Sequence, residues 1–160
     1  MTDTTERERV VELMRSSPIA MLTHLDSTGA LVSHPMATQD VDPDGALYFI
    51  AERSSQKVQD LEQRPTVNVS YSNHGSWVSV SGTARIVNDE AKLAELWDSF
   101  TSAWLEGGPD NPENVLIQVD PDAAEYWDAP GGSKVTQLVN LVKAKTTGNR
   151  IEGDNATVDL

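Results

Sequence analysis

Ala46-Leu-Tyr-Phe-Ile-Ala-Glu-Arg-Ser-Ser-Gln-Lys57 is the stretch that says most about the fold of this chain. It contains an alternating apolar run that ends in two serines and a lysine, and the helical pattern of Val58–Glu62 follows at once. A strand that stops at Ser54–Ser55 before a helix leaves backbone N–H groups unpaired at the helix N-terminus, beside hydroxyls and an ammonium. The stretch therefore predicts a phosphate cradle at a strand-to-helix junction.

The same residues have a simpler interpretation as a helix cap. In that case Ser54 or Ser55 accepts a hydrogen bond from the first helical turn, as serine often does there, and Lys57 is a solvated surface charge. Both interpretations place a strand before the junction and a helix after it. The sequence on either side of the junction is needed to choose between them.

The size and hydrophobicity of the chain are typical of one water-soluble domain. Its 160 residues are enough to bury a core, its hydrophobic fraction is 38%, and its mean hydropathy is −0.40. The longest apolar runs are far shorter than the ~20 residues that a membrane span needs. Residues Thr2–Arg9 are polar and charged, unlike a secretory leader, which predicts a cytoplasmic protein.

The charge and the residue inventory argue against several kinds of partner. Lysine and arginine number 12 against 25 acidic side chains, so the net charge of −13 repels nucleic acid and anionic membranes. A ligand that carries phosphate needs a local basic site to overcome this field. The chain has no cysteine, and His24, His34 and His74 are too scattered to form a metal cluster, so we expect no metal site.

Hydrophobic periodicity divides the first half of the chain into a short helix and three strands. The helix is expected over Glu6–Arg15 and ends before Pro18. The strands are expected at Ile19–Thr23, Leu31–Thr38 and Leu47–Ile50. Turns at Asp26–Gly29 and Asp42–Gly45 separate them, so we expect these strands to form a meander.

Three further helices are expected after these strands. The first is Val58–Arg64, the second begins after Asp89 and runs to Trp104, and the third lies within Val135–Val142. In the second of these helices Trp97, Phe100 and Trp104 recur at helical spacing, so we expect them to be packing residues.

Alternating strands make up most of the remaining sequence. They are expected at Thr66–Tyr71, Trp77–Val87 and Val115–Val119, and the polar tail from Thr146 contains a short edge strand at Thr157–Val158. Five or six antiparallel strands in one domain, with helices between them, favour a closed or partly closed β barrel, because closure removes exposed strand edges. The predicted fold class is mainly β (α+β).

Five segments occur in the order and at the spacings of one known family. They are Ser33–Met36, Leu47–Ala51 leading to Ser55–Lys57, Val67–Tyr71, Trp77–Ala84, and Glu125–Asp128 followed by Lys134–Leu138. Over roughly Val10–Lys145 the chain resembles the flavin-binding split barrels related to pyridoxamine phosphate oxidase, in the branch called general stress proteins. The resemblance implies a six-stranded antiparallel split β-barrel with flanking helices in residues 1–145, and a polar C-terminal tail in residues 146–160.

The resemblance also implies a homodimer that holds two FMN or FAD molecules in grooves between its subunits. Ser55 and Lys57 match the phosphate-binding serine and lysine of the family, in agreement with the cradle inferred from local chemistry. The family strand that approaches the flavin corresponds to Ser33, His34, Pro35 and Met36.

Two strand residues and two tryptophans complete the implied cofactor site. Ile50 and Ala51 match the strand end that lies against the flavin and its ribityl chain. Trp77 matches a residue near the flavin ring, and Trp127 matches one that approaches the flavin of the partner subunit. Both tryptophans have a second interpretation, Trp77 as a core or rim aromatic and Trp127 as an anchor of the dimer interface.

Two departures from the family pattern bear on function. Relatives commonly have arginine in place of His34, and a guanidinium suits phosphate better than an imidazole that is mostly neutral at pH 7. True pyridoxamine phosphate oxidases have arginine and histidine after their equivalent of Trp127, whereas this chain has only Lys134 there. We therefore do not expect vitamin B6 oxidase activity.

The leading hypothesis is a homodimeric flavoprotein that acts as an oxidoreductase on a small molecule, since the sequence shows no convincing acid–base or nucleophilic set. The catalytic residues stay unknown at this stage. The rival hypothesis is a non-catalytic stress protein that holds flavin or another cofactor without turnover. The deazaflavin F420 and haem are further candidate ligands, because relatives of this barrel adapt the same groove.

Overall fold

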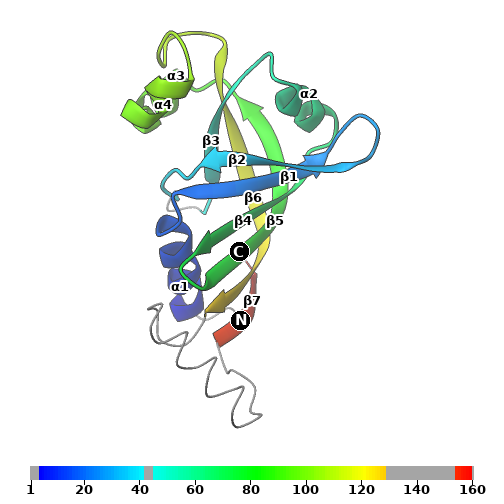
Figure 1. The fold of residues 1–160 in the computed structure, drawn as a ribbon, viewed down its shortest axis with the longest axis vertical. Helices are drawn as coiled ribbons and strands as arrows, with labels where there is room; N and C mark the ends of the chain where they lie inside the picture. The colour runs from blue at the N-terminus through cyan, green and yellow to red at the C-terminus, as the bar shows by residue number, and fades with distance from the viewer. Residues whose placement is uncertain (1–3, 42–44, 129–153, 160) are drawn as a thin grey trace.

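The computed structural model describes residues 4–41, 45–128 and 154–159. Figure 1 shows a curled sheet with short helices around it. The elements in chain order are α1 (Thr4–Arg15), β1 (Ile19–Leu25), β2 (Leu31–Ala37), β3 (Leu47–Glu52), α2 (Gln56–Gln63), β4 (Thr66–Asn73), β5 (Ser76–Val87), α3 (Glu90–Leu96), α4 (Ser99–Trp104), β6 (Asn114–Asp128) and β7 (Asp154–Asp159).

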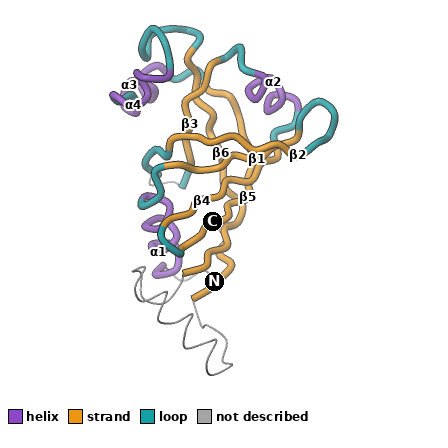
Figure 2. Tube along the Cα trace, viewed as in Figure 1, coloured by secondary structure: helices purple, strands orange, loops and turns teal. Residues whose placement is uncertain are grey.

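Six strands form one antiparallel sheet in the order β2-β1-β4-β5-β6-β3, and β7 is added beside β6. The sheet curls into a half-barrel, as the trace in Figure 2 shows. Within the described residues no ladder joins the two end strands, β2 and β3, so the barrel is split rather than closed. The predicted mainly β fold, a six-stranded antiparallel split barrel with flanking helices, is confirmed.

The expected meander of the first three strands is wrong. β2 pairs with β1 as expected, but β3 pairs with β6, in the register Leu47↔Val119 to Glu52↔Asn114. The first half of β6 is buried throughout, so it needs a partner on both edges, and β5 and β3 supply them. Of the turn expected at Asp42–Gly45, only Gly45 lies within the described residues.

β6 is one long strand of 15 residues, whereas the sequence predicted a strand only at Val115–Val119. β5 pairs with it along its whole length, with a bulge beside Gly82 that absorbs one extra residue of β6. A side chain at Gly82 would lie 2.5 Å from the carbonyl oxygen of Asp120, so only glycine fits this close approach. The other edge of β6 pairs first with β3 and then with β7.

The hydrophobic core lies against the concave face of the sheet, where α1 packs on β4 and β5 and α2 packs on β1 and β5. In Figure 1 these two helices lie on opposite sides of the β1–β2 hairpin. The helix predicted at Glu6–Arg15 is confirmed and buries Val10, Leu13 and Met14. The helix predicted at Val58–Arg64 is confirmed with a start at Gln56, and buries Val58 and Leu61.

The single helix expected from Asp89 to Trp104 is two helices. Asp89 does cap α3, where its carboxylate accepts from the backbone N–H of Lys92 at 3.0 Å. The chain is then extended at Trp97, and α4 begins after Asp98. The predicted packing role is wrong for two of the aromatics on this segment, because Phe100 is 49% exposed and Trp104 is 74% exposed.

The tail contains an edge strand, as predicted at Thr157–Val158, but this strand is longer and pairs with β6 over Asp154–Asp159. The helix expected within Val135–Val142 and the boundary expected between residues 145 and 146 lie outside the described residues. In the part of the chain that the structure describes, none of the helices is long and apolar enough to cross a membrane.

Candidate functional site

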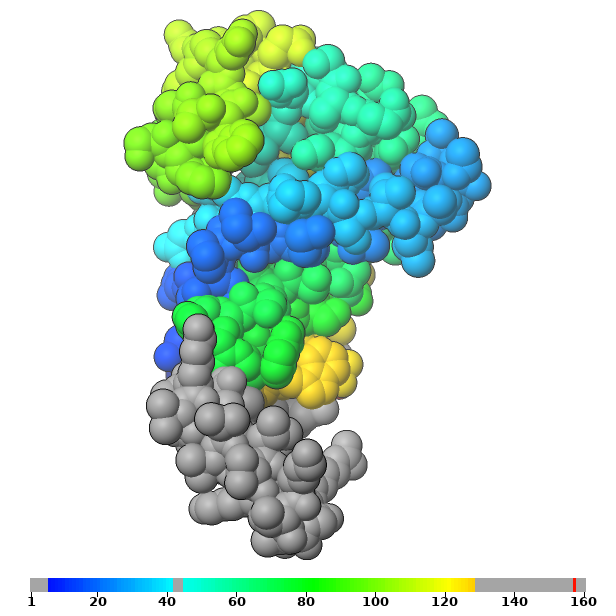
Figure 3. Space-filling model, in the orientation of Figure 1, coloured from blue at the N-terminus to red at the C-terminus, as the bar shows by residue number. Residues whose placement is uncertain are grey.

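A cavity of about 440 Å³ lies where the β1–β2 hairpin, β3, α2 and α4 meet. Figure 3 shows a hollow here, with the blue and cyan hairpin on one side and the yellow-green of α4 on the other. Its size is within the usual range of small-molecule sites. Its lining includes Pro35, Met36 and Ala37 from β2, Ile50, Ala51 and Glu52 from β3, Ser55 and Lys57 at the start of α2, and Phe100, Thr101 and Trp104 from α4.

Ser55 occupies the cap position of α2 without capping it. Its backbone is extended (φ −66°, ψ 145°), but its hydroxyl makes no cap bond to the helix and donates instead to the carbonyl oxygen of Glu52 at 2.7 Å. The first turn of α2 also contains no acidic residue. The simpler interpretation of the junction, a serine cap, is therefore not what Ser55 does, and the first amides of α2 have no capping side chain.

Lys57 is a half-buried cation whose charge is not matched. Within the described residues its Nζ donates only to the thioether sulfur of Met36, at 3.5 Å, and no carboxylate lies within 4.0 Å of it. Burial lowers the pKa of Lys57 below its ordinary value, and the negative charge of Glu52 opposes this only in part. An ammonium held in this way beside uncapped amides is suited to an anion.

The cavity brings together six of the ten residues predicted for the cofactor site. These are Pro35, Met36, Ile50, Ala51, Ser55 and Lys57. The other four, Ser33, His34, Trp77 and Trp127, do not line it. Ser33 lies on the outer face of β2, where its hydroxyl oxygen is 2.6 Å from that of Thr23.

His34 faces the interior of the half-barrel, opposite the buried Leu22 of β1. Its Nε2 lies 3.0 Å from Nε2 of His24, which is 1% exposed, and the two ring planes are nearly parallel. Burial lowers the pKa of His34, the charges of Lys57 and His24 lower it further, and Asp60 opposes them. His34 is thus coupled to Lys57 electrostatically, without forming part of the cavity wall.

Trp77 and Trp127 are cross-strand partners on β5 and β6. They are 48% and 37% exposed, and in Figure 1 their ends of these strands lie far from α2 and α4. The neighbouring carboxylate of Asp128 accepts from Arg9 Nε at 2.9 Å and from the Ser76 hydroxyl at 2.6 Å. Burial alone would raise the pKa of Asp128, but these hydrogen bonds leave it below its ordinary value.

Sequence reasoning missed the α4 side of the cavity. Besides the aromatics of α4, the cavity-lining residues that were not predicted are Ile19, Ala37, Gln39, Glu52, Thr101 and Leu105. Phe100 and Trp104 were assigned to packing because their spacing fitted one continuous helix. The signal that could have corrected this is Asp98-Ser99, since a second capping residue inside a helical pattern indicates a new helix start.

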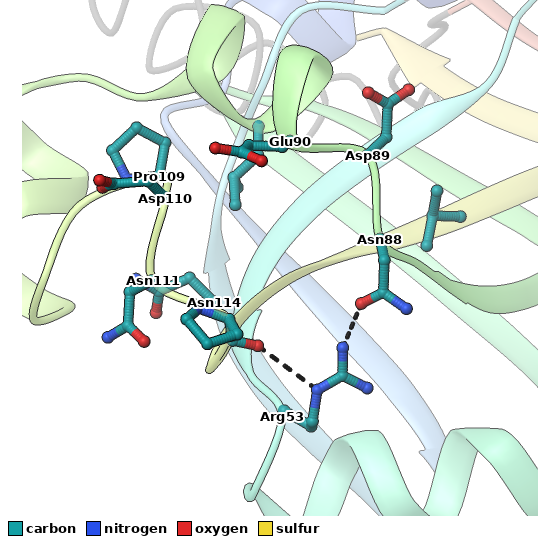
Figure 4. Close-up of a pocket in the computed structure, with 11 residues that line it drawn as sticks. Arg53, Asn88, Asp89, Glu90, Pro109, Asp110, Asn111 and Asn114 are labelled. Carbon is teal, nitrogen blue, oxygen red and sulfur yellow. Dashed lines mark hydrogen bonds between the residues drawn. The ribbon is translucent and has the colours of Figure 1, made fainter.

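A second hollow, of about 310 Å³, lies between the end of β3, the start of α3 and the segment before β6. Figure 4 shows Arg53 reaching across it toward Asn88. The guanidinium donates to the side-chain oxygen of Asn88, and its Nε donates to the carbonyl oxygen of Pro112 at 3.4 Å. Among the described residues no group of three histidine, cysteine or acidic side chains could hold a metal ion, here or elsewhere.

The comparisons with known proteins agree with the half-barrel fold. Residues 5–152 match the family described as pyridoxamine 5′-phosphate oxidase like. The chain belongs to this family. The resemblance stated from the sequence, to split barrels related to pyridoxamine phosphate oxidase and their general stress protein branch, is confirmed.

Three relatives show how far the likeness extends. Protein bli-3 of Neurospora crassa is 34% identical over 125 residues, which are 71% of this chain and 60% of that protein. The general stress FMN/FAD binding protein of Xanthomonas citri is 28% identical, with a TM-score of 0.64 over 78% of this chain and 89% of that one. A general stress protein 26 assigned in Jannaschia sp. CCS1 shares the fold at 23% identity, with a TM-score of 0.77 over 98% and 100% of the two chains.

Proposed function

We propose that the cavity binds FMN, or the FMN portion of FAD, with the phosphate at the start of α2. The observation that carries this proposal is the half-buried ammonium of Lys57, which lies beside uncapped helix amides and has only a thioether as its hydrogen-bond acceptor in the described part of the chain. A phosphate would supply the missing negative charge. The hydroxyl of Ser55 lies at the same end of the cavity.

The rest of the cavity suits a planar ring. Met36 and Ala51 are buried, and with Pro35 and Ile50 they form an apolar wall beside the charged end. FMN has a similar two-ended character, because one end is a flat ring with an apolar dimethylbenzene half and the other end is a negatively charged phosphate. The relative from Xanthomonas citri, an FMN/FAD-binding protein by name, supports this assignment.

The second part of the proposal is a homodimer formed through the outer face of the sheet. Antiparallel register places Pro35, Met21, Ser70, Ser79 and Glu125 in one outward row and Ser33, Thr23, Asn68, Ser81 and Ala123 in the next. Glu125 is the one charged residue in these two rows. Because the other residues of the two rows are uncharged, we call the two rows together the uncharged face.

A second copy of this chain is the occupant that the uncharged face suits best. Two molecules of net charge −13 repel each other, so they can approach closely only where few carboxylates meet. Trp77 and Trp127 extend this face, and large exposed aromatics are typical of interface cores. The face also reaches the cavity, because Pro35 belongs to both.

A homodimer of this kind would explain why Trp77 and Trp127 are exposed on the outer face of the sheet. Neither Trp77 nor Trp127 lines the cavity of its own chain. In a twofold dimer, the face of each protomer would lie against the cavity rim of the other, so we propose that these tryptophans of each protomer complete its partner's flavin groove.

We propose an oxidoreductase as the activity. A bound flavin supplies hydride or electron transfer, while the protein binds and orients it. The part played by this chain would be anion binding by Lys57 and Ser55 and exclusion of water by the apolar wall. The alternative, a holder of flavin without turnover, is favoured by one observation: the cavity-lining residues described include no histidine or tyrosine to carry a proton.

One experiment tests the ligand and then the activity. The absorbance spectrum of freshly purified protein is recorded alone and during titration with FMN, FAD, F420 and haem. We expect FMN or FAD to bind with a perturbed flavin spectrum, and preferential binding of F420 or haem would overturn the ligand assignment. Reduction of the bound flavin by NADH or NADPH, and its reoxidation by an added acceptor, would identify an enzyme; a flavin that resists reduction would identify a holder.

A further inference from the structure

Helix α4 presents two exposed aromatic side chains to the cavity. Phe100 and Trp104 are 49% and 74% exposed, and both line the cavity. Their ring centroids are 6.3 Å apart, with the planes tilted by 50°. Aromatic side chains left in water at a cavity wall are suited to stacking against a ligand ring.

The exposure of these rings follows from a well-defined helix break. The carboxylate of Asp98 accepts from the backbone N–H and the hydroxyl of Thr101, both at 2.7 Å, and so starts α4. The indole N–H of Trp97 donates to the Ser102 hydroxyl at 2.8 Å and spans the break. With this helix start Thr101 is buried, and Phe100 and Trp104 stay exposed where they line the cavity.

The α4 side of the cavity differs in charge from the α2 side. The charged residues that line the cavity in the described part of the chain are Glu52 and Lys57, both near the start of α2. The other described lining residues, among them Ile19, Ala37 and Leu105, are uncharged. A ligand that stacks on α4 therefore finds an uncharged environment.

We propose that Phe100 and Trp104 form a stacking wall for an uncharged planar aromatic molecule, which is the substrate class of this site. This inference rests on the proposed function, because a flavin anchored at the α2 end leaves the α4 side for a second ring. The wall selects a ligand by its flat π face, since the α4 side offers few polar groups for directional recognition.

The test compares two alcohols that share a carbon skeleton and differ in aromaticity. FMN-loaded protein is titrated by calorimetry with 2-naphthol, which is planar and aromatic, and with decahydro-2-naphthol, which is saturated. We expect 2-naphthol to bind at least about tenfold more tightly, because only its ring can stack on the wall. Equal affinities for the two alcohols would overturn the proposal.

Four variants assign the effect to the wall. Trp104→Ala and Phe100→Ala should each weaken 2-naphthol by about fivefold to tenfold, Trp104→Phe should keep most of the affinity, and FMN affinity should stay within about twofold. Leu31→Ala is the control, since Leu31 is 75% exposed but lies at the β1–β2 hairpin, outside the cavity lining. It should leave the affinities for both ligands unchanged.

Other outcomes identify what the wall contacts instead. If Trp104→Ala weakens the binding of FMN and not that of 2-naphthol, the wall contacts the cofactor. If the variant is a monomer in sedimentation equilibrium where the wild type is a dimer, the wall is part of the dimer interface. Either result overturns the substrate assignment. If wild-type protein takes up no flavin, the proposed function fails, and the same titrations on flavin-free protein test the stacking wall alone. Binding of 2-naphthol in preference to decahydro-2-naphthol, lost in Trp104→Ala, would support the wall. Equal binding of the two alcohols would overturn it.

Discussion

Arg53 and Lys57 are four residues apart, and each reaches into a hollow of the molecule, but their surroundings are opposite. The guanidinium of Arg53 donates to the side chain of Asn88 and to the carbonyl oxygen of Pro112. The ammonium of Lys57 is half-buried against the sulfur of Met36, and no carboxylate of the described residues lies within salt-bridge distance.

The difference separates a structural cation from a binding cation. Arg53 has neutral protein oxygens as acceptors, so the fold itself satisfies it. Lys57 has lost part of its hydration without gaining an anion, which disfavours its charged form and lowers its pKa. A ligand that carries phosphate would reverse that loss at Lys57 and would bring no comparable gain at Arg53.

Assembly should give the largest effect, because the cavity borders the uncharged face and the hollow at Arg53 does not. Met21→Glu places a carboxylate within that face, on both copies. We expect wild-type protein to sediment at about twice the chain mass at micromolar concentration, and the variant to sediment as a monomer with weakened FMN binding. Gln63→Glu adds the same charge on the exposed side of α2 and should leave the dimer intact. A dimeric Met21→Glu variant would place the interface elsewhere.

The flavin affinity should distinguish the two cations directly. Lys57→Ala should weaken FMN by about tenfold or more, the loss of at least ~1.4 kcal/mol, because it removes the charge-assisted contact to phosphate. Arg53→Ala, which removes a cation of the same sign from the neighbouring hollow, should change FMN affinity by less than about twofold. Calorimetry measures the FMN affinity of the two variants in parallel. Equal losses of affinity would mean that each cation acts only through its charge at long range and that Lys57 makes no direct contact with the phosphate.

How much of this contrast the sequence could predict depends on how local each feature is. The junction at Ser54–Lys57 could be predicted because a strand end, a helix start and a lysine are all contained in a few residues. The sequence could not show that Arg53 is satisfied, since its partners Asn88 and Pro112 are 35 and 59 residues away. The pairing of β3 with β6 was missed for the same reason.

The miss on α4 has a different physical origin. The spacing of Phe100 and Trp104 fits a continuous amphipathic helix, and that pattern says nothing about a break. The break depends on the capping bonds that Asp98 makes to Thr101, which compete with continuation of the helix. A periodic pattern therefore predicted the helical state of these residues correctly and their burial wrongly.

Removing the charge of Lys57 and removing the charge of Arg53 should change the stability of the ligand-free protein in opposite directions. Lys57→Met removes a half-buried charge and keeps an apolar stem, so it should raise the free energy of unfolding by about 0.5 kcal/mol. Arg53→Met should lower it by about 0.5–1 kcal/mol, because Asn88 and Pro112 lose their donor. Urea denaturation of both variants measures this. A Lys57→Met variant less stable than wild type would show that the fold already satisfies Lys57.

The smallest expected effect concerns His34, which couples to Lys57 from inside the half-barrel. Its pKa is lowered by burial first, then by the positive charges of Lys57 and His24, and Asp60 on α2 opposes them. A histidine with a lowered pKa protonates less readily in the folded state than in the unfolded chain. As the pH falls below its ordinary value of about 6.5, the unfolded state therefore binds the proton first and stability is lost.

We accordingly expect the free energy of unfolding to decrease between about pH 6.5 and pH 5, and His34→Gln to flatten part of that decrease. Glutamine keeps a donor toward Nε2 of His24, so the hydrogen bond survives while the titrating group is removed. Bound FMN should also reduce the contribution of His34 to this decrease in the free energy of unfolding. A phosphate beside Lys57 would offset one of the positive charges that lower the pKa of His34. Urea denaturation across this range, with and without FMN, provides the comparison. If FMN leaves the difference between wild type and His34→Gln unchanged, the phosphate does not lie at Lys57.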